Sequence, residues 1–158
     1  MSNTSDALYT ILELSRLTGI SDRTIRKYIH EGKLKGELRG GRWMFTYEQV
    51  RAFVVAPDNE PVFRRIRSSV YNCYVSERRV VEPIRFIYID IPGCDEETLR
   101  ELINVASLPP PIKGATYCFY VSDGVAHLAY YGTNKAISEV RRYVFANCPN
   151  IARVLGGE

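Results

Sequence analysis

Residues 9–53 read YTILELSRLTGISDRTIRKYIHEGKLKGELRGGRWMFTYEQVRAF, and the caps, apolar positions and glycines of this stretch decide the fold of the first part of the chain. Thr10 and Glu13 have the three-residue separation of a capping box, in which each side chain bonds the backbone amide of the other residue. Apolar residues then recur at helical spacing, and Gly19 suits the left-handed position that follows a helix. The sequence therefore predicts a first helix over about 11–18.

A second helix is predicted after a short turn. Ser21 is its expected N-cap and Gly32 closes it. Ile25 and Ile29, four residues apart, form its inward face, and Tyr28 flanks them. The outward face is rich in cations and carries Arg23, Thr24, Arg26, Lys27 and His30.

Residues 33–45 read as two short strands joined by a Gly-Gly pair, which favours a two-residue hairpin turn. Arg39 and Arg42 bracket this turn. Thr46 begins a second capping box, so a third helix is expected to reach about Val55.

The runs GISDRTIRKYIHEGKL (19–34) and GGRWMFTYEQVRAF (40–53) resemble the excisionase-like, MerR-related winged helix-turn-helix family. The shared features are a Ser-x-Arg-Thr opening of the second helix, a Gly-Gly wing followed by aromatic residues, and a Thr-capped third helix. The resemblance covers about the first 55 residues and implies that the second helix enters a DNA major groove, with the wing near an adjacent backbone. The predicted DNA-binding residues are Ser21, Arg23, Thr24, Arg26, Lys27, Tyr28, His30, Arg39, Gly40, Gly41 and Arg42.

Each of these residues also has a simpler interpretation. Arg and Lys side chains bind guanine edges and phosphates, but a charged helix face is commonly only solvated. Arg39 and Arg42 would equally keep an edge strand soluble. The ring of Tyr28 is expected to pack inward, which leaves only its hydroxyl for a phosphate.

The composition is that of a folded protein, because 46% of the 158 residues are hydrophobic and 25% are charged. No apolar run approaches the ~20 residues of a membrane helix, and the N-terminus lacks a secretory pattern, so we expect a cytoplasmic protein. The net charge is +3, and residues 1–56 carry nine Lys/Arg against six Asp/Glu, while residues 57–158 carry twelve of each. The whole positive excess thus lies where the predicted DNA-binding residues are.

The segment 57–61 has two prolines and three polar residues and reads as a linker. Apolar residues at helical spacing over 63–73 then favour a connecting helix, although the β-branched and aromatic residues after Val70 also fit a strand. The resemblance supports the helix, because MerR-like proteins dimerise through one. A second basic cluster around this segment would extend the DNA footprint, bind an anion or be solvated; it comprises Arg64, Arg65, Arg67, Arg78, Arg79 and Arg85.

Residues 80–158 have the alternating pattern of strands and helices, and no family resemblance is recognised for them. Strands are expected over 84–91, 115–121 and 125–131, with a last short strand over 150–155. Helices are expected from an Asp95 cap to residue 108, and from a cap at Thr133 or Asn134. The order β-α-β-β-α-β is the ferredoxin-like plan.

Tyrosines are abundant in this second part, and some must lie on a sheet face away from the helices. An exposed aromatic face is a candidate effector or dimer surface, for which Tyr88, Tyr117 and Tyr130 are the predicted residues.

Enzyme chemistry is not indicated. His127 has no Ser or Cys partner at a recognisable spacing, so we expect a satisfied histidine, and no phosphate loop or dinucleotide motif is present. The four cysteines lie far apart, so we expect reduced, mostly buried thiols and neither a metal site nor a cofactor.

The sequence thus predicts an α+β chain in three segments: a polar tail over 1–8 leads into a winged helix-turn-helix over 7–56, a linker and connecting helix follow over 57–79, and a ferredoxin-like domain over 80–158 dimerises, senses an effector, or both. The expected function is that of a dimeric, sequence-specific transcriptional regulator that binds double-stranded DNA and responds to a small-molecule or protein effector. Two alternatives remain: an excisionase-like architectural recombination factor, and a protein–protein adaptor that keeps the fold without binding DNA.

Overall fold

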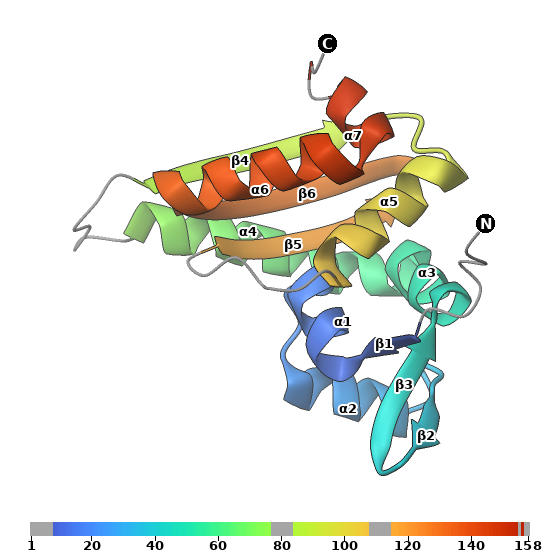
Figure 1. Ribbon diagram of the computed structural model, residues 1–158. Coiled ribbons are helices and arrows are strands. Elements are labelled where there is room, and N and C mark those ends of the chain that lie inside the picture. Colours follow the sequence, from blue (N-terminus) through green and yellow to red (C-terminus); the bar gives the residue numbers. More distant parts are fainter. Residues whose placement is uncertain (1–7, 77–83, 108–114, 155, 157–158) are drawn as a thin grey trace.

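The computed structural model describes residues 8–76, 84–107, 115–154 and 156. These residues form two three-stranded antiparallel sheets, each with its own helices. In Figure 1 the N-terminal sheet and its helices (blue to cyan) lie below the C-terminal sheet, which has helices on both faces.

The N-terminal part follows the predicted order. Thr10 and Glu13 form the capping box, and Gly19 takes a left-handed φ of 75° after the first helix. Gly40 and Gly41 both have positive φ, as a two-residue hairpin turn requires. The elements are β1 (Leu8–Thr10), α1 (Ile11–Thr18), α2 (Asp22–His30), β2 (Glu37–Arg39), β3 (Arg42–Thr46) and α3 (Tyr47–Val55).

Strand β1 is not among the predicted elements, because the sequence indicates a polar tail up to residue 8. β1 pairs antiparallel with β3, with Tyr9 opposite Phe45, and the sheet order is β1-β3-β2. Both Tyr9 and Phe45 are buried, so this pairing places the hairpin against the helices. Three residues are too few for a periodicity signal, and the strand exists only because β3 is there to pair with it.

After the extended Ala56, the segment that follows α3 is helical: η2, a 3₁₀ turn (Pro57–Asn59), leads directly into α4 (Glu60–Ser76). The connecting helix favoured over 63–73 is therefore confirmed, and the alternative strand after Val70 is wrong. The Asn59 side chain is buried, and its Nδ2 donates to the Phe53 carbonyl at 3.0 Å. What reads as a linker in the sequence is a packed turn.

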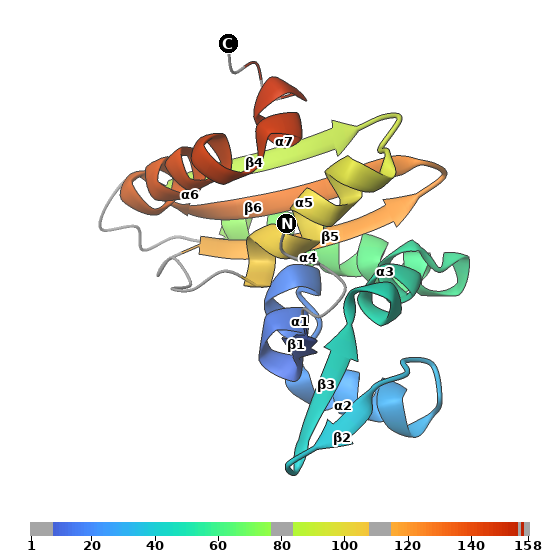
Figure 2. The ribbon, with the colours of Figure 1, turned by 45° about the vertical axis from the view of Figure 1, so that its right-hand side comes forward.

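The C-terminal sheet has the order β4-β6-β5, and both pairs are antiparallel. Figures 1 and 2 show α5 and α6 on one face of this sheet and α4 on the other. The elements are β4 (Ile84–Ile91), α5 (Glu96–Ser107), β5 (Ala115–Ser122), β6 (Val125–Thr133), α6 (Asn134–Asn147) and α7 (Pro149–Val154).

The last predicted strand is wrong, because residues 149–154 form helix α7. Pro149 has no amide to donate to a strand ladder, and its fixed φ suits the first turn of a helix. Glu101 of α5 accepts from the Asn150 and Ile151 amides at 3.1 Å, which satisfies the free donors of that turn. The order β-α-β-β-α is therefore followed by a helix, and the ferredoxin-like plan is not completed.

The two parts share one hydrophobic core. Phe53 of α3 packs edge-on against Phe63 of α4, and Phe63 stacks on Tyr120 of β5 with ring centroids 5.6 Å apart. Buried residues form one continuous cluster from Tyr9 to Ile151. In three dimensions α1 lies against β5 and α5, so the N-terminal part is fixed on the second sheet.

Polar contacts at the rim reinforce this junction. The Tyr9 hydroxyl donates to Asn104 Oδ1 at 2.5 Å, and Glu96 accepts from Tyr47 at 3.0 Å and from Arg51 at 2.8 Å. The hydrogen bonds from Arg51 and Tyr47 hold the pKa of the Glu96 carboxyl below its usual range, and the bond from Arg51 has the larger effect.

Candidate DNA-binding surface

Helix α2 is held by its inward face and its N-terminal cap. Ile25 is fully buried, and the buried Tyr28 ring lies 6.0 Å from the Phe53 ring. Ser21 Oγ accepts from the Thr24 amide at 3.3 Å, and the two hydroxyls lie 2.9 Å apart. The Ser21 and Thr24 hydroxyls are thus engaged in capping, and Tyr28 belongs to the core.

The outward face of α2 carries cations that are ion-paired with neighbouring acids. Arg26 Nε lies 2.6 Å from Asp22 Oδ1, and Lys27 and Lys33 both reach Glu31, at 3.7 and 3.5 Å. All three basic side chains are more than half exposed. Exposed pairs of this kind contribute on the order of 0.2–1 kcal/mol, so they add little to the stability of the fold.

The hairpin of β2 and β3 adds further cations. Arg39 donates through Nε and Nη2 to Glu37 Oε2, at 2.9 and 2.7 Å. In the described part of the chain, Arg42 has no ion-pair partner, and the same holds for Arg23 at the start of α2. These two arginines and His30 are exposed.

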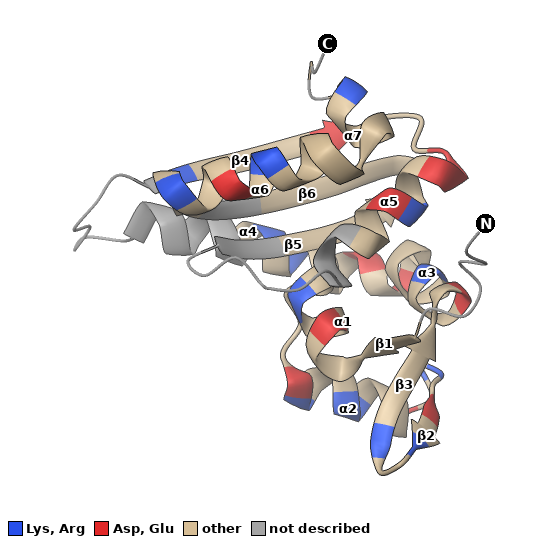
Figure 3. Cartoon of the chain, viewed as in Figure 1, with Lys and Arg blue, Asp and Glu red and all other residues tan. Residues whose placement is uncertain are grey.

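The positions of α2 and the hairpin place these side chains at one end of the molecule. Figures 1 and 2 show both elements at the end of the molecule farthest from β4, with the hairpin turn projecting outward. Figure 3 shows basic residues on α2 and at this turn, with acidic residues on the same elements. Residues 21–42 contain seven Lys/Arg and three Asp/Glu. This α2–hairpin surface therefore has the net positive charge that phosphates attract.

The geometry agrees with the family comparison. Residues 8–54, under a third of the chain, match the family model of a helix-turn-helix domain. This part of the chain is therefore a helix-turn-helix domain of the DNA-binding, excisionase-like kind, which confirms the resemblance seen in the sequence. No curated protein and no solved structure matches the chain.

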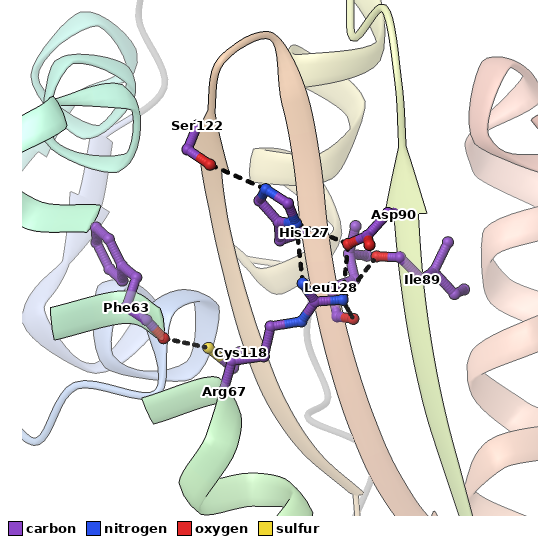
Figure 4. A network of polar contacts seen from close by, with 8 residues as sticks. All are labelled: Phe63, Arg67, Ile89, Asp90, Cys118, Ser122, His127 and Leu128. Carbon is purple, nitrogen blue, oxygen red and sulfur yellow. Dashed lines mark hydrogen bonds and ion pairs between the residues drawn. The ribbon is translucent and has the colours of Figure 1, made fainter. Parts of the chain in front are cut away.

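A second polar cluster, which no sequence pattern predicted, lies where α4 crosses the C-terminal sheet (Figure 4). His127 Nε2 lies 2.9 Å from Ser122 Oγ, and His127 Nδ1 lies 2.7 Å from Asp90 Oδ1. Arg67 Nη2 reaches the same Asp90 oxygen at 2.8 Å, and Arg67 Nη1 lies 2.9 Å from His127 Nδ1. Although counted in the second basic cluster, Arg67 is only 3% exposed.

The Arg67 guanidinium is also bound by the sheet itself. Its Nη2 donates to the carbonyls of Ile89 and Leu128, and its charge lies 3.1 Å from the centroid of the Tyr88 ring. Burial raises the pKa of the Asp90 carboxyl, but the hydrogen bonds from His127 and Arg67 outweigh that effect and hold the pKa below its usual range. The cluster thus joins α4 to β4 and β6.

Ser122, His127 and Asp90 have the order and spacing of a nucleophilic relay, in which the imidazole takes a proton from the hydroxyl. Arg67 Nη1 lies 2.9 Å from the ring, and Arg67 Nη2 shares the carboxylate that such a relay would use. The same contacts hold α4 against the sheet, which is a structural role. The expectation of a satisfied histidine is confirmed, whereas the serine partner was missed.

The predicted tyrosine surface is described only at Tyr88, whose side chain is 51% exposed. Register pairs Tyr117 with Tyr130 across β5 and β6, and their side chains lie outside the described set, as do Arg78 and Arg79.

The cysteines that can be described are free. Cys118 and Cys148 are buried and Cys94 is half-buried. Burial raises the pKa of the Cys118 thiol to about 12, so it stays protonated. Within residues 8–76, 84–107 and 115–154, no three His, Cys, Asp or Glu side chains gather as metal ligands, and no helix could span a membrane.

Proposed function

We propose that the chain is a sequence-specific transcriptional regulator that binds double-stranded DNA through α2 and the β2–β3 wing. The observation that carries this proposal is the exposed, net positive α2–hairpin surface on a matched helix-turn-helix domain. A single small helix-turn-helix gains specificity by pairing two half-sites, so the regulator acts as a homodimer. Residues 80–158 supply dimerisation or effector sensing, and the half-exposed Tyr88 is the candidate effector surface.

The test uses the full chain, because the N-terminal part shares its core with the second sheet. Sites are selected from a random duplex library, and fluorescence anisotropy then measures affinity for a selected and a scrambled duplex across a salt series. Binding that falls steeply with salt and prefers the selected duplex supports the proposal. The double variant Arg23→Ala/Arg26→Ala should lose both properties, whereas Arg142→Ala/Arg153→Ala removes the same charge from exposed positions on α6 and α7 and should not.

Absence of salt-dependent affinity in the wild-type chain would overturn the proposal and favour a protein–protein adaptor. The same outcome for both double variants would show that net charge, and not the α2 surface, causes binding.

An excisionase-like architectural factor is the second candidate, favoured by the kind of helix-turn-helix that the chain contains. Such a factor bends DNA over long, weakly specific footprints. Two measurements separate the candidates. Site selection should give a palindromic site for a regulator, whereas a circular-permutation gel-shift assay should give a mobility that changes with site position for an architectural factor.

The non-enzymatic character that we propose is tested with a fluorophosphonate probe, and labelling of Ser122 would contradict it.

A further inference from the structure

The acids within the α2–hairpin surface hold two arginines in different ways. Asp22 accepts a hydrogen bond only from the Nε of Arg26, at 2.6 Å. Glu37 accepts hydrogen bonds from both the Nε and the Nη2 of Arg39, at 2.9 and 2.7 Å. All four side chains are more than half exposed, so the pairs face solvent and not the core.

We propose that Asp22 is a specificity-determining positioning residue, which fixes Arg26 for reading a base, and that Glu37 holds Arg39 at the wing turn for a phosphate contact. The proposal rests on the proposed function and deepens it. The Asp22–Arg26 bond leaves both terminal nitrogens of Arg26 free, and two parallel donors are what guanine O6 and N7 require. Arg26 is thereby presented end-on with one orientation already selected.

Arg39 is held more firmly than Arg26, because two of its five donors bind one Glu37 oxygen along the Nε–Nη2 edge. Its place next to the hairpin turn suits contact with a phosphate oxygen, which carries no sequence information. The hairpin turn beside it has two glycines with positive φ and no side chains, which permits close approach to a DNA backbone.

The same carboxylates lower affinity for DNA of any sequence. Each acid neutralises a neighbouring cation and brings a negative charge toward the phosphates, so fewer counterions are released on non-specific binding. On the selected sequence this loss of affinity is offset at Arg26, because the arginine is already oriented for the base contact. Asp22 therefore increases the ratio of specific to non-specific affinity.

The experiment measures that ratio by anisotropy on the selected and scrambled duplexes, with the full-length chain throughout. Asp22→Ala, which removes the acceptor, should lower the ratio by about tenfold and raise non-specific affinity. Asp22→Asn keeps an oxygen acceptor without the charge and should retain most of the ratio. Glu37→Gln should raise affinity for both duplexes alike and steepen the salt slope by up to about one unit, with the ratio unchanged.

Glu97→Gln is the matched control, because it removes one exposed negative charge from α5, far from α2, and should leave both affinities unchanged. Thermal unfolding of each variant verifies that the α2 cap survives. An unchanged ratio in Asp22→Ala, or identical effects of the Asp22 and Glu37 substitutions, overturns the proposal while leaving DNA binding intact. A wild-type chain without affinity for either duplex overturns both this proposal and the proposed function.

Discussion

Gly36 lies against the Phe45 ring, and a Cβ added to it would lie 2.5 Å from Phe45 Cε1. The ring is fully buried in the core, where close packing leaves it no space to move aside. We expect Gly36→Ala to lower the free energy of unfolding by about 1–3 kcal/mol, measured by urea denaturation. Lys35→Ala, at the exposed neighbouring position, should change it by less than ~0.5 kcal/mol. Equal losses in both variants would place the effect in the backbone of the segment before β2 and not in the ring contact.

Arg26 and Arg42 differ in surroundings and should differ in effect on DNA binding. Arg26→Ala should cost about 1–3 kcal/mol on the selected duplex and relax discrimination at one base pair. Arg42, at the wing turn without an ion-pair partner among described residues, should act as a phosphate contact. Arg42→Ala should weaken all duplexes alike and lower the salt slope by about one. A sequence-dependent loss in Arg42→Ala would contradict this division.

Helix α4 is attached to the sheet by the Arg67–Asp90–His127 cluster, and the lowered pKa of Asp90 makes that attachment pH-dependent. A carboxyl with a lowered folded-state pKa stabilises the fold above its unfolded-state pKa, and this contribution is lost as the pH falls through the folded-state pKa. We therefore expect the stability difference between wild type and Asp90→Asn to be full above about pH 5 and to vanish in stronger acid. Urea midpoints across pH 2–7 measure it, and a difference that stays constant to the lowest pH would show that Asp90 makes no charge-dependent contribution.

Helices and strands whose signals lie in their own residues were predictable from the sequence. Helices and strands that form only against a partner segment were not. Caps and periodicity fixed α1, α2 and α3 in the sequence, and the apolar run at 84–91 fixed β4. Strand β1 needed the pairing of β3, and the amides of α7 needed Glu101 from a distant helix. Neither partner can be recognised from the segment itself.

The candidate sites divide in the same way. The exposed cations of α2 follow from a period of 3.6 residues, and Asp22 and Arg26 are four apart, so their pairing was also within reach of the sequence. The hairpin turn at Asp123-Gly124 fixes the β5–β6 register and would have brought Ser122 near His127. The burial of Arg67 depends on how α4 docks on the sheet, for which a charged residue in a helix gives no local signal.

The whole molecule should unfold as one unit, although its sequence divides into two parts. The continuous core through Phe53, Phe63 and Tyr120 means that neither part can expose its half of the interface without cost. Trp43 is the only tryptophan and packs against this core from the wing, so its fluorescence reports the N-terminal part, whereas far-UV circular dichroism reports all elements.

We expect the two probes to give the same urea midpoint and the same slope. Phe63→Ala, which removes the fully buried ring between the two parts, should lower the free energy of unfolding by about 3–5 kcal/mol. Val62→Ala, at the half-buried neighbouring position, is the control and should cost less. A Trp43 transition at lower urea than the circular dichroism transition in the wild-type chain would show that the helix-turn-helix unfolds independently. If the helix-turn-helix unfolded independently, an effector bound to the second sheet could not change the position of α2 through the core. The two urea midpoints therefore also test this route from the second sheet to α2.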